Sequence, residues 1–276
     1  MDFQKYGDAE AFSSDVLGIL LENEVQNNLL ISILTDSKAR YASDWLMATV
    51  ADYSGIVLTA LCTKPFNLLL YESGRASTDA MDLLAREIRR LGAGLPGVLA
   101  ERSLARRFAD AYLPGCPIEP RMSMIVMRLD SLAEHKVAPG SCRTLQERDM
   151  YFVPFWERSF SEDSKVQVFS IKDNVDRIKT RLGKNSHFIW EDGIPVSQAV
   201  NGRCTPNGAV INMVYTPPHY RGRGYATSVV AELAGSLLKR GHSFCCLFAD
   251  AENPVSRELY RKLGFYDVYT FDDIRF

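Results

Sequence analysis

Residues 210–265 carry the clearest succession of elements in the chain, and they read VINMVYTPPHYRGRGYATSVVAELAGSLLKRGHSFCCLFADAENPVSRELYRKLGF. The apolar run at 210–215 predicts a strand, which ends at the Thr-Pro-Pro of 216–218 because proline has no N–H to continue a ladder. An amphipathic helix is predicted next, beginning near residue 225 and ending at Lys-Arg-Gly. Its expected apolar face consists of Ala226, Val229, Val230, Leu233, Leu237 and Leu238.

The turn before this helix has the composition of an anion site. Gly222 and Gly224 allow positive φ angles and close approach of a ligand to the backbone. The first N–H groups of the helix have no partner within the helix and point into the turn, and its dipole adds roughly 0.3–1 kcal/mol for an anion. Arg221 and Arg223 add positive charge. A phosphate or pyrophosphate is therefore favoured over the alternative, an ordinary strand-to-helix turn.

A second strand and helix complete the segment. Residues 244–248 are fully apolar, as in a buried strand. Asn253 followed by proline predicts a helix start, and Gly264 predicts its end. Asn253 and Tyr260 are seven positions apart, so they are expected along one side of this helix. Its expected core residues are Val255, Leu259 and Leu263.

Upstream of this segment, residues 130–141 combine charge, proline and glycine without periodicity, which predicts a linker between domains. Thr144 and Glu147 have the spacing of a capping box, so a helix is expected from there toward residue 160. The next expected elements are a hairpin with strands at 187–191 and 196–200, its Asp192-Gly193 turn, and a loop at 201–208.

The first half of the chain alternates between helical and strand-like spacing of apolar residues. Its expected elements are a helix at 15–34, strands at 45–51, 56–62 and 68–71, helices at 79–91 and 103–112, and an extended run at 122–129. This order roughly repeats that of the second half. Two similar domains are therefore expected, which agrees with a length of 276 residues at about 150 per domain.

Composition excludes several classes of protein. The net charge of −2 provides no positive field for nucleic acid. The longest apolar runs, at 55–61 and 226–238, are too short or interrupted to cross a membrane, and the acidic start MDFQKYGDAE does not resemble a signal peptide. The six cysteines form no CxxC pair and the four histidines are scattered, so no metal site is expected. We expect a cytoplasmic protein with reduced thiols.

Residues 221–226, Arg-Gly-Arg-Gly-Tyr-Ala, resemble the pyrophosphate loop of the GNAT superfamily of acetyl-coenzyme A dependent N-acetyltransferases. That pattern is Arg or Gln, two variable residues, Gly, one variable residue, then Gly or Ala. Asn253 and Tyr260, with Leu-Gly-Phe at 263–265, resemble the second motif of the superfamily. The resemblance implies an α/β fold of two GNAT-like domains, each a mostly antiparallel twisted sheet flanked by helices. The second domain, residues 139–276, would be catalytic.

Residues 1–138 would then be a degenerate GNAT-like domain. Pro-Gly-Val-Leu at 96–99, leading into the predicted helix at 103–112, looks like the amino-terminal domain of some bacterial two-domain members. At the turn that matches the pyrophosphate loop, residues 72–76 read Glu-Ser-Gly-Arg-Ala. They lack the paired glycines and place an acid where phosphate would lie. We therefore expect this copy to bind no coenzyme.

The resemblance also implies acetyl transfer to a primary amine of a small molecule or peptide, by direct attack on the thioester. The implied contacts with acetyl-CoA are Met213, Val214, Tyr215, Arg221, Gly222, Arg223, Gly224, Tyr225, Ala226, Thr227, Asn253 and Tyr260. A main-chain N–H near Val214 or Tyr215 would polarise the acetyl carbonyl, and Tyr260 would protonate the departing thiolate. The general base is left open among water, Glu157, Glu191, Asp192 and His219.

Two other functions compete with this one. A regulatory protein that binds coenzyme A without turnover would keep the loop, but it has no need for an acid at the thiol. A dinucleotide-dependent oxidoreductase is suggested by Gly-Arg-Gly, but Thr227 stands where its third glycine belongs. Among large aromatic residues, Trp156, Phe160 and Trp190 are expected either along the acceptor cleft or in the core.

Overall fold

The computed structural model describes residues 1–36, 44–74 and 76–276, which divide by internal packing into two units. Unit 1 consists of Met1–Val126 and Val268–Phe276, and unit 2 consists of Met127–Asp267. The chain passes between the units within two strands, β6 (Pro120–Leu129) and β12 (Tyr266–Arg275). The assignment of residues 1–138 and 139–276 as two homologous domains stays a prediction.

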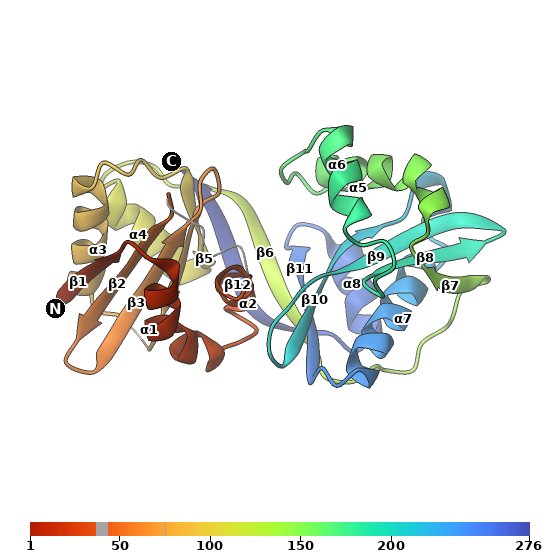
Figure 1. Ribbon diagram of the computed structural model, residues 1–276, viewed down its shortest axis with the longest axis horizontal. Helices are drawn as coiled ribbons and strands as arrows, with labels where there is room; N and C mark the ends of the chain where they lie inside the picture. Colours follow the sequence, from red (N-terminus) through yellow and green to blue (C-terminus); the bar gives the residue numbers. More distant parts are fainter. Residues whose placement is uncertain (37–43, 75) are drawn as a thin grey trace. The chain divides into compact units, whose positions relative to one another are not determined.

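Unit 1 is built on a mostly antiparallel sheet in the order β1-β2-β3-β4-β5-β12-β6, in which β4 and β5 pair in parallel. Its further strands are β1 (Asp2–Tyr6), β2 (Leu46–Asp52), β3 (Gly55–Cys62), β4 (Leu68–Glu72) and β5 (Gly97–Glu101). Its helices are α1 (Ala9–Leu21), α2 (Asn28–Leu34), α3 (Thr78–Arg90) and α4 (Arg102–Tyr112). Helices α3 and α4 lie on one face of this sheet and α1 and α2 on the other (Figure 1). Alternate strand residues face opposite ways, so Ala48 and Ala60 pack with the first pair of helices, whereas Met47 and Leu61 pack with the second.

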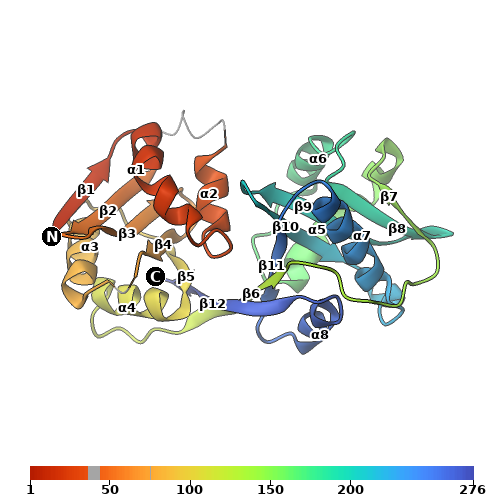
Figure 2. The ribbon, with the colours of Figure 1, turned by 90° about the horizontal axis from the view of Figure 1, so that it is seen from below.

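Unit 2 has the strand order β6-β11-β10-β9-β8-β7. Its strands are β7 (Ser141–Thr144), β8 (His187–Asp192), β9 (Ile194–Cys204), β10 (Gly208–Tyr215) and β11 (Phe244–Asp250). Its helices are η2 (Glu147–Tyr151), α5 (Val153–Asp163), α6 (Ile171–Lys179), η3 (Pro218–Tyr220), α7 (Tyr225–Lys239) and α8 (Pro254–Lys262). Helices α5 and α6 cover one face of β8–β10 and α7 covers the other, while α8 contacts β11 and α7 (Figures 1 and 2).

The expected mixed α/β class is confirmed, together with the strand, turn and helix succession of residues 210–265. Helix α7 follows Gly224 and ends at Lys239, and α8 begins after Asn253, whose side chain accepts the Ser256 N–H at 3.2 Å. The hairpin around Asp192-Gly193 is also confirmed by β8 and β9. None of the helices in the described ranges has the length and apolar character needed to cross a bilayer.

The single helix expected at 15–34 is wrong, because the structure has two helices there. Between α1 and α2, the Asn27 side chain donates to the Leu20 carbonyl at 3.0 Å and that of Asn28 donates to the Val25 carbonyl at 2.6 Å. Both asparagines are buried. Their amides occupy carbonyls that a continuous helix would need for its own N–H groups, so the helix ends and restarts.

The capping box expected at Thr144 and Glu147 is also wrong. Thr144 belongs to β7, and the buried Asp149 carboxylate instead accepts the Gln146 N–H at 2.8 Å. This interaction forms the short helix η2, and α5 begins only at Val153. The position of this helix start is therefore set by Asp149, whose buried carboxylate accepts from Arg143 at 2.7 Å.

Two further expectations need correction. The loop expected at 201–208 is shorter, because β9 continues to Cys204 and Arg203 pairs with Val210. Val255 does not face the core, since it is 77% exposed in the first turn of α8. The buried side of that helix is formed by Tyr260 and Leu263, which are three positions apart and therefore share a face.

A buried carboxylate ties the end of the chain to unit 1. Asp272 on β12 accepts the Ser123 hydroxyl at 2.7 Å and the Arg106 Nε at 3.0 Å, and its side chain is fully buried. Burial by itself would raise the pKa of Asp272, but these donors and the charge of Arg102 outweigh it and hold the pKa below its usual value. Asp272 therefore stabilises unit 1 in its ionised form.

Replacing Asp272 by Asn should lower the free energy of unfolding by about 2 kcal/mol at pH 7, since buried donors lose a charged acceptor. Because the folded pKa is depressed, the wild-type contribution is present above about pH 4, the unfolded value, and is lost as the pH falls further. Urea unfolding at pH 7 and pH 3 checks this: the difference between wild type and variant should shrink at pH 3. Asp110→Asn, an exposed change on α4, is the control. An equal difference at both pH values would contradict the role of the charge.

Candidate functional site

The central feature of unit 2 is the parting of two parallel strands. Strands β10 and β11 pair at Gly208 with Phe244, at Ala209 with Cys245 and at Val210 with Cys246, and within the described chain the ladder stops there. From Ile211 onward, β10 pairs with β9 alone. The edge of β10 that faces β11 therefore carries peptide groups free to bind an extended ligand as an added strand.

A bulge lies in β10 within this opened stretch. Its pairing with β9 shifts between Asn212, which is opposite Val200, and Tyr215, which is opposite Gln198. Met213, inside the bulge, has a φ of 50°, a left-handed conformation that a side chain rarely adopts. Bulges turn individual peptide groups out of the ladder. The bulge thus changes the direction of peptide groups at 213–215, where the resemblance to the GNAT superfamily implies contacts with a thioester.

The glycine turn follows directly. Gly222 and Gly224 have φ angles of 78° and 83°, so both need the freedom of glycine. Gly224 is the residue before α7, and no side chain caps the helix at this end. The first N–H groups of a helix of 15 residues therefore remain open to an anion, beside the exposed Arg221 and Arg223. The residues present fit a diphosphate.

Side chains from α5 and from the β8–β9 hairpin hold the turn. Arg221 donates to the Thr216 carbonyl at 2.9 Å and pairs with Asp163 at the end of α5 at 2.7 Å. The Tyr225 hydroxyl donates to the Asp192 carboxylate at 2.6 Å, which raises the pKa of Tyr225. The glycine turn is thus positioned by two elements besides its own strand and helix.

The two motif residues at α8, Asn253 and Tyr260, differ in their exposure to solvent. Asn253 is exposed and its Oδ1 serves as the helix cap, which leaves Nδ2 as the group available to a ligand. Tyr260 is 8% exposed, with its ring 5.7 Å from that of Phe265. Burial alone raises the pKa of Tyr260, so its phenol stays protonated at neutral pH. The contacts shown for these two residues lie within α8 and its flanking turns.

The candidates for a general base have different surroundings. Glu191 pairs with Arg143 and Arg148, and Asp192 accepts from Tyr225. His219 lies in the exposed turn η3, with its ring against Tyr220. Glu157 on α5 is 1% exposed and pairs with Arg181 through Oε1, while its buried Oε2 has no hydrogen-bond partner among the residues that the structure describes. Glu157 is therefore the candidate base whose carboxylate keeps one oxygen, Oε2, available to accept a proton.

The two tryptophans expected near the acceptor cleft or in the core also differ in their surroundings. Trp190 is 2% exposed and donates to the Pro139 carbonyl at 2.8 Å, so it belongs to the core. Trp156 is only partly buried, and its ring lies 6.1 Å from that of Tyr215 at the end of β10. Of the two, Trp156 is the one that lies beside the opened strand.

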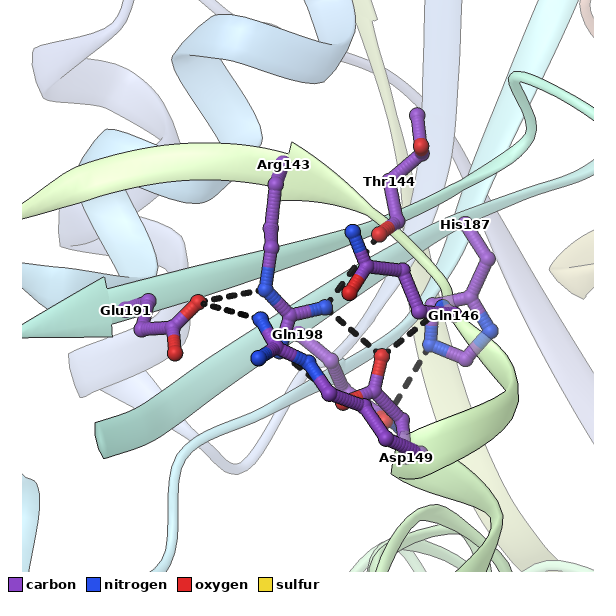
Figure 3. A network of polar contacts seen from close by, with 8 residues as sticks. Arg143, Thr144, Gln146, Asp149, His187, Glu191 and Gln198 are labelled. Atoms are coloured by element: carbon purple, nitrogen blue, oxygen red, sulfur yellow. Dashed lines mark hydrogen bonds and ion pairs between the residues drawn. The ribbon is translucent and has the colours of Figure 1, made fainter.

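A polar network on the α5–α6 side of the sheet was not predicted from the sequence (Figure 3). Arg143 donates to both Asp149 oxygens, at 2.7 and 2.9 Å, and to Glu191. Beside this group, His187 Nε2 lies 3.3 Å from Gln198 Oε1, and both residues are fully buried. The available signal was the occurrence of polar residues inside two otherwise apolar predicted strands.

The matching turn of unit 1 is filled by its own side chain. The Glu72 carboxylate accepts the Ala76 N–H at 3.1 Å and pairs with Arg107, and Ser77 caps α3 by accepting the Ala80 N–H at 3.2 Å. Arg75 lies outside the described residues. A carboxylate thus accepts a main-chain N–H in this turn, and the absence of coenzyme binding in unit 1 stays a prediction.

Comparison with known proteins agrees with this geometry. Residues 192–271 match the model of the FR47-like protein family. An acetyltransferase of the GNAT family from Colwellia psychrerythraea aligns over 100% of both chains at 10% identity, with a TM-score of 0.64. A GCN5-related N-acetyltransferase from Sphaerobacter thermophilus aligns over 83% of this chain and 80% of its own at 17% identity, with a TM-score of 0.63.

A third similar structure is a tandem GNAT protein from the clavulanic acid biosynthesis pathway. It aligns over 99% of this chain and 97% of its own at 14% identity, with a TM-score of 0.58. No curated protein sequence matches the chain. The family match includes the glycine turn and Tyr260, and the structural matches extend over both units. The chain therefore has the fold of the GNAT acetyltransferases, expected from the motifs at 221–226 and 253–265.

Proposed function

We propose that the protein is an acetyl-CoA dependent N-acetyltransferase that moves an acetyl group to a primary amine of a small molecule or peptide. The observation that carries this proposal is the parting of β10 from β11 beside an uncapped helix with a glycine turn. One end of this arrangement suits an extended arm and the other a diphosphate, which is the chemical outline of coenzyme A. The GNAT fold of the chain supports the same reaction class.

In this proposal, three segments of the chain contact successive parts of the cofactor. Met213, Val214 and Tyr215 offer peptide groups to the pantetheine arm and to the thioester, which supplies the activated acetyl group. Residues 221–227 offer N–H groups to the diphosphate. Asn253 donates from Nδ2, the half of its amide that the helix cap leaves available.

The chemical step needs a hydrogen-bond donor to the developing oxyanion, an acid for the thiolate and an acceptor for the proton of the amine. A main-chain N–H at Val214 or Tyr215 supplies the first, and losing such a donor typically costs about 10²-fold or more in rate. The buried, protonated Tyr260 suits an acid for a thiolate. The free Oε2 of Glu157 suits the acceptor for the ammonium proton, because α5 packs on β10.

Gly224→Ala should weaken acetyl-CoA binding about tenfold, or 1.4 kcal/mol, because a Cβ disfavours the φ of 83° that directs the helix N–H groups. Gly241→Ala is a matched control, since that glycine has a φ of 97° at the opposite end of α7 with open space around it. Calorimetric titration with acetyl-CoA distinguishes them. Equal affinities in the two variants would contradict the proposed diphosphate site.

Tyr260→Phe should lower kcat about 10²-fold and leave the Kd for acetyl-CoA within twofold, because only the proton donor is lost. Release of free thiol, measured with a panel of amines, gives kcat. Tyr266→Phe is the control, since the Tyr266 hydroxyl donates to Asp130 on the surface. Unchanged turnover in the Tyr260 variant would remove it from the mechanism. Binding of acetyl-CoA by the wild type without any turnover would favour a regulatory coenzyme A binding protein.

Glu157→Gln should lower kcat/KM about 10²-fold near pH 7. The loss should diminish as the pH rises, because more of the amine then arrives already deprotonated. Rate–pH profiles with a fixed amine measure this. Glu162→Gln, an exposed change on the same helix, is the control. A pH-independent loss of the same size would assign Glu157 to structure only.

A further inference from the structure

The bulge of β10 requires a restraint that its own strand does not supply. Met213 is in the left-handed region with a φ of 50°, which is unfavourable for a residue with a side chain. Such conformations persist where surrounding groups determine them. The groups that hold Met213 in place therefore matter for any chemistry at the bulge.

Gln198 on β9 provides this restraint. Its Nε2 donates to the Met213 carbonyl at 3.4 Å, while its Oε1 lies 3.3 Å from His187 Nε2 on β8. Gln198 and His187 are fully buried. The two ends of one amide thus join the bulge to a second strand across the sheet.

The Met213 carbonyl fixes which way the Gln198 amide points, because a carbonyl can only accept and an inverted amide would place two acceptors together there. The amide oxygen therefore lies at His187 (Figure 3). Because that oxygen can only accept, Nε2 of His187 carries the hydrogen and Nδ1 does not. The amide orientation observed is therefore the one that satisfies both contacts.

The charge of His187 does not disturb this arrangement. Burial and the positive charge of Arg181 lower the pKa of His187 to about 3, against the opposing effects of Gln198 and Asp149. Arg181 is itself paired with Glu157, and Asp149 with Arg143. The imidazole is neutral at physiological pH and donates to Gln198 throughout.

Peptide geometry carries the restraint to the next residue. The Met213 carbonyl and the Val214 N–H belong to one planar trans peptide, so they point in opposite directions. Holding the carbonyl against the Gln198 side chain fixes the plane of this peptide and with it the direction of the Val214 N–H. Val214 lies beyond Val210, in the part of β10 that borders the opening toward β11.

We infer that Gln198, held between His187 and the Met213 carbonyl, is a positioning residue that aims the Val214 N–H into the opening between β10 and β11, where it donates to the acetyl carbonyl. This inference rests on the proposed acetyl transfer. It assigns a role to two side chains that lie outside the glycine turn and outside α8. It also accounts for a buried histidine and a buried glutamine on neighbouring strands.

Gln198→Met tests the inference, because methionine keeps the length of the side chain and removes both contacts. We expect kcat to fall about 10²-fold, as for a lost oxyanion donor, with the KM for acetyl-CoA within twofold. Asn174→Leu is the matched control, since the buried Asn174 amide donates to the Pro154 carbonyl and does not contact the bulge. If both variants lose similar stability but only Gln198→Met loses kcat, positioning is supported. Equal kcat in the two would overturn it.

A second readout separates this inference from the proposed function. Hydrogen exchange at the Val214 amide, followed by NMR in the ligand-free protein, should change in Gln198→Met and stay as in wild type in Asn174→Leu. A wild type without acetyltransferase activity would refute the proposed function, while an unchanged Val214 exchange rate would refute the restraint itself. Should Gln198→Met not fold, Gln198→Glu serves instead. Its kcat should recover as the pH is lowered, because the protonated carboxyl donates to Met213, and a flat profile would overturn the inference.

Discussion

The interrupted pairing of β10 with β11 is the constraint on which the rest of unit 2 depends. Three residue pairs join the strands, from Gly208 with Phe244 to Val210 with Cys246. Beyond them the bulge at Met213 changes the course of β10 and leaves main-chain groups to be satisfied by something other than β11. A strand edge inside a sheet is costly unless it is used, which is why the opening, the glycine turn and the uncapped helix α7 are best understood as one site.

Residues 210–265 could be predicted closely because each boundary there has a local chemical cause. Pro217 and Pro218 stop the strand, Gly224 precedes α7, and the Asn253 side chain caps α8. Other features depend on partners far away in the chain. Asn27 and Asn28 divide a periodic helix by bonding to nearby carbonyls, and β12 joins unit 1 through Asp272 and Asp273, with Asp273 accepting from Asn67 at 2.6 Å. These features are determined by burial and long-range pairing, which the local periodicity of the sequence does not show.

The candidate site likewise has parts that follow from local sequence and parts that depend on distant contacts. The glycine turn and its arginines follow from spacing, and so does the placement of Tyr260 on α8. The sequence left four side chains open as bases, and burial and pairing distinguish Glu157 from the others. His187 and Gln198 were not predicted, because Gln198 contacts the Met213 carbonyl, a main-chain atom that no sequence pattern marks, and His187 contacts Gln198. In unit 1, the Glu72 carboxylate accepts the Ala76 N–H within the turn for which the sequence predicts no coenzyme binding.

The crystal structure of the protein with acetyl-CoA bound tests the central claim most directly. The account predicts main-chain hydrogen bonds between the pantetheine arm and β10 beyond Val210, with the diphosphate against the N–H groups of residues 222–226 in unit 2. An arm bound elsewhere, or a β10–β11 ladder that closes past Val210 and Cys246 when the ligand is present, would contradict it.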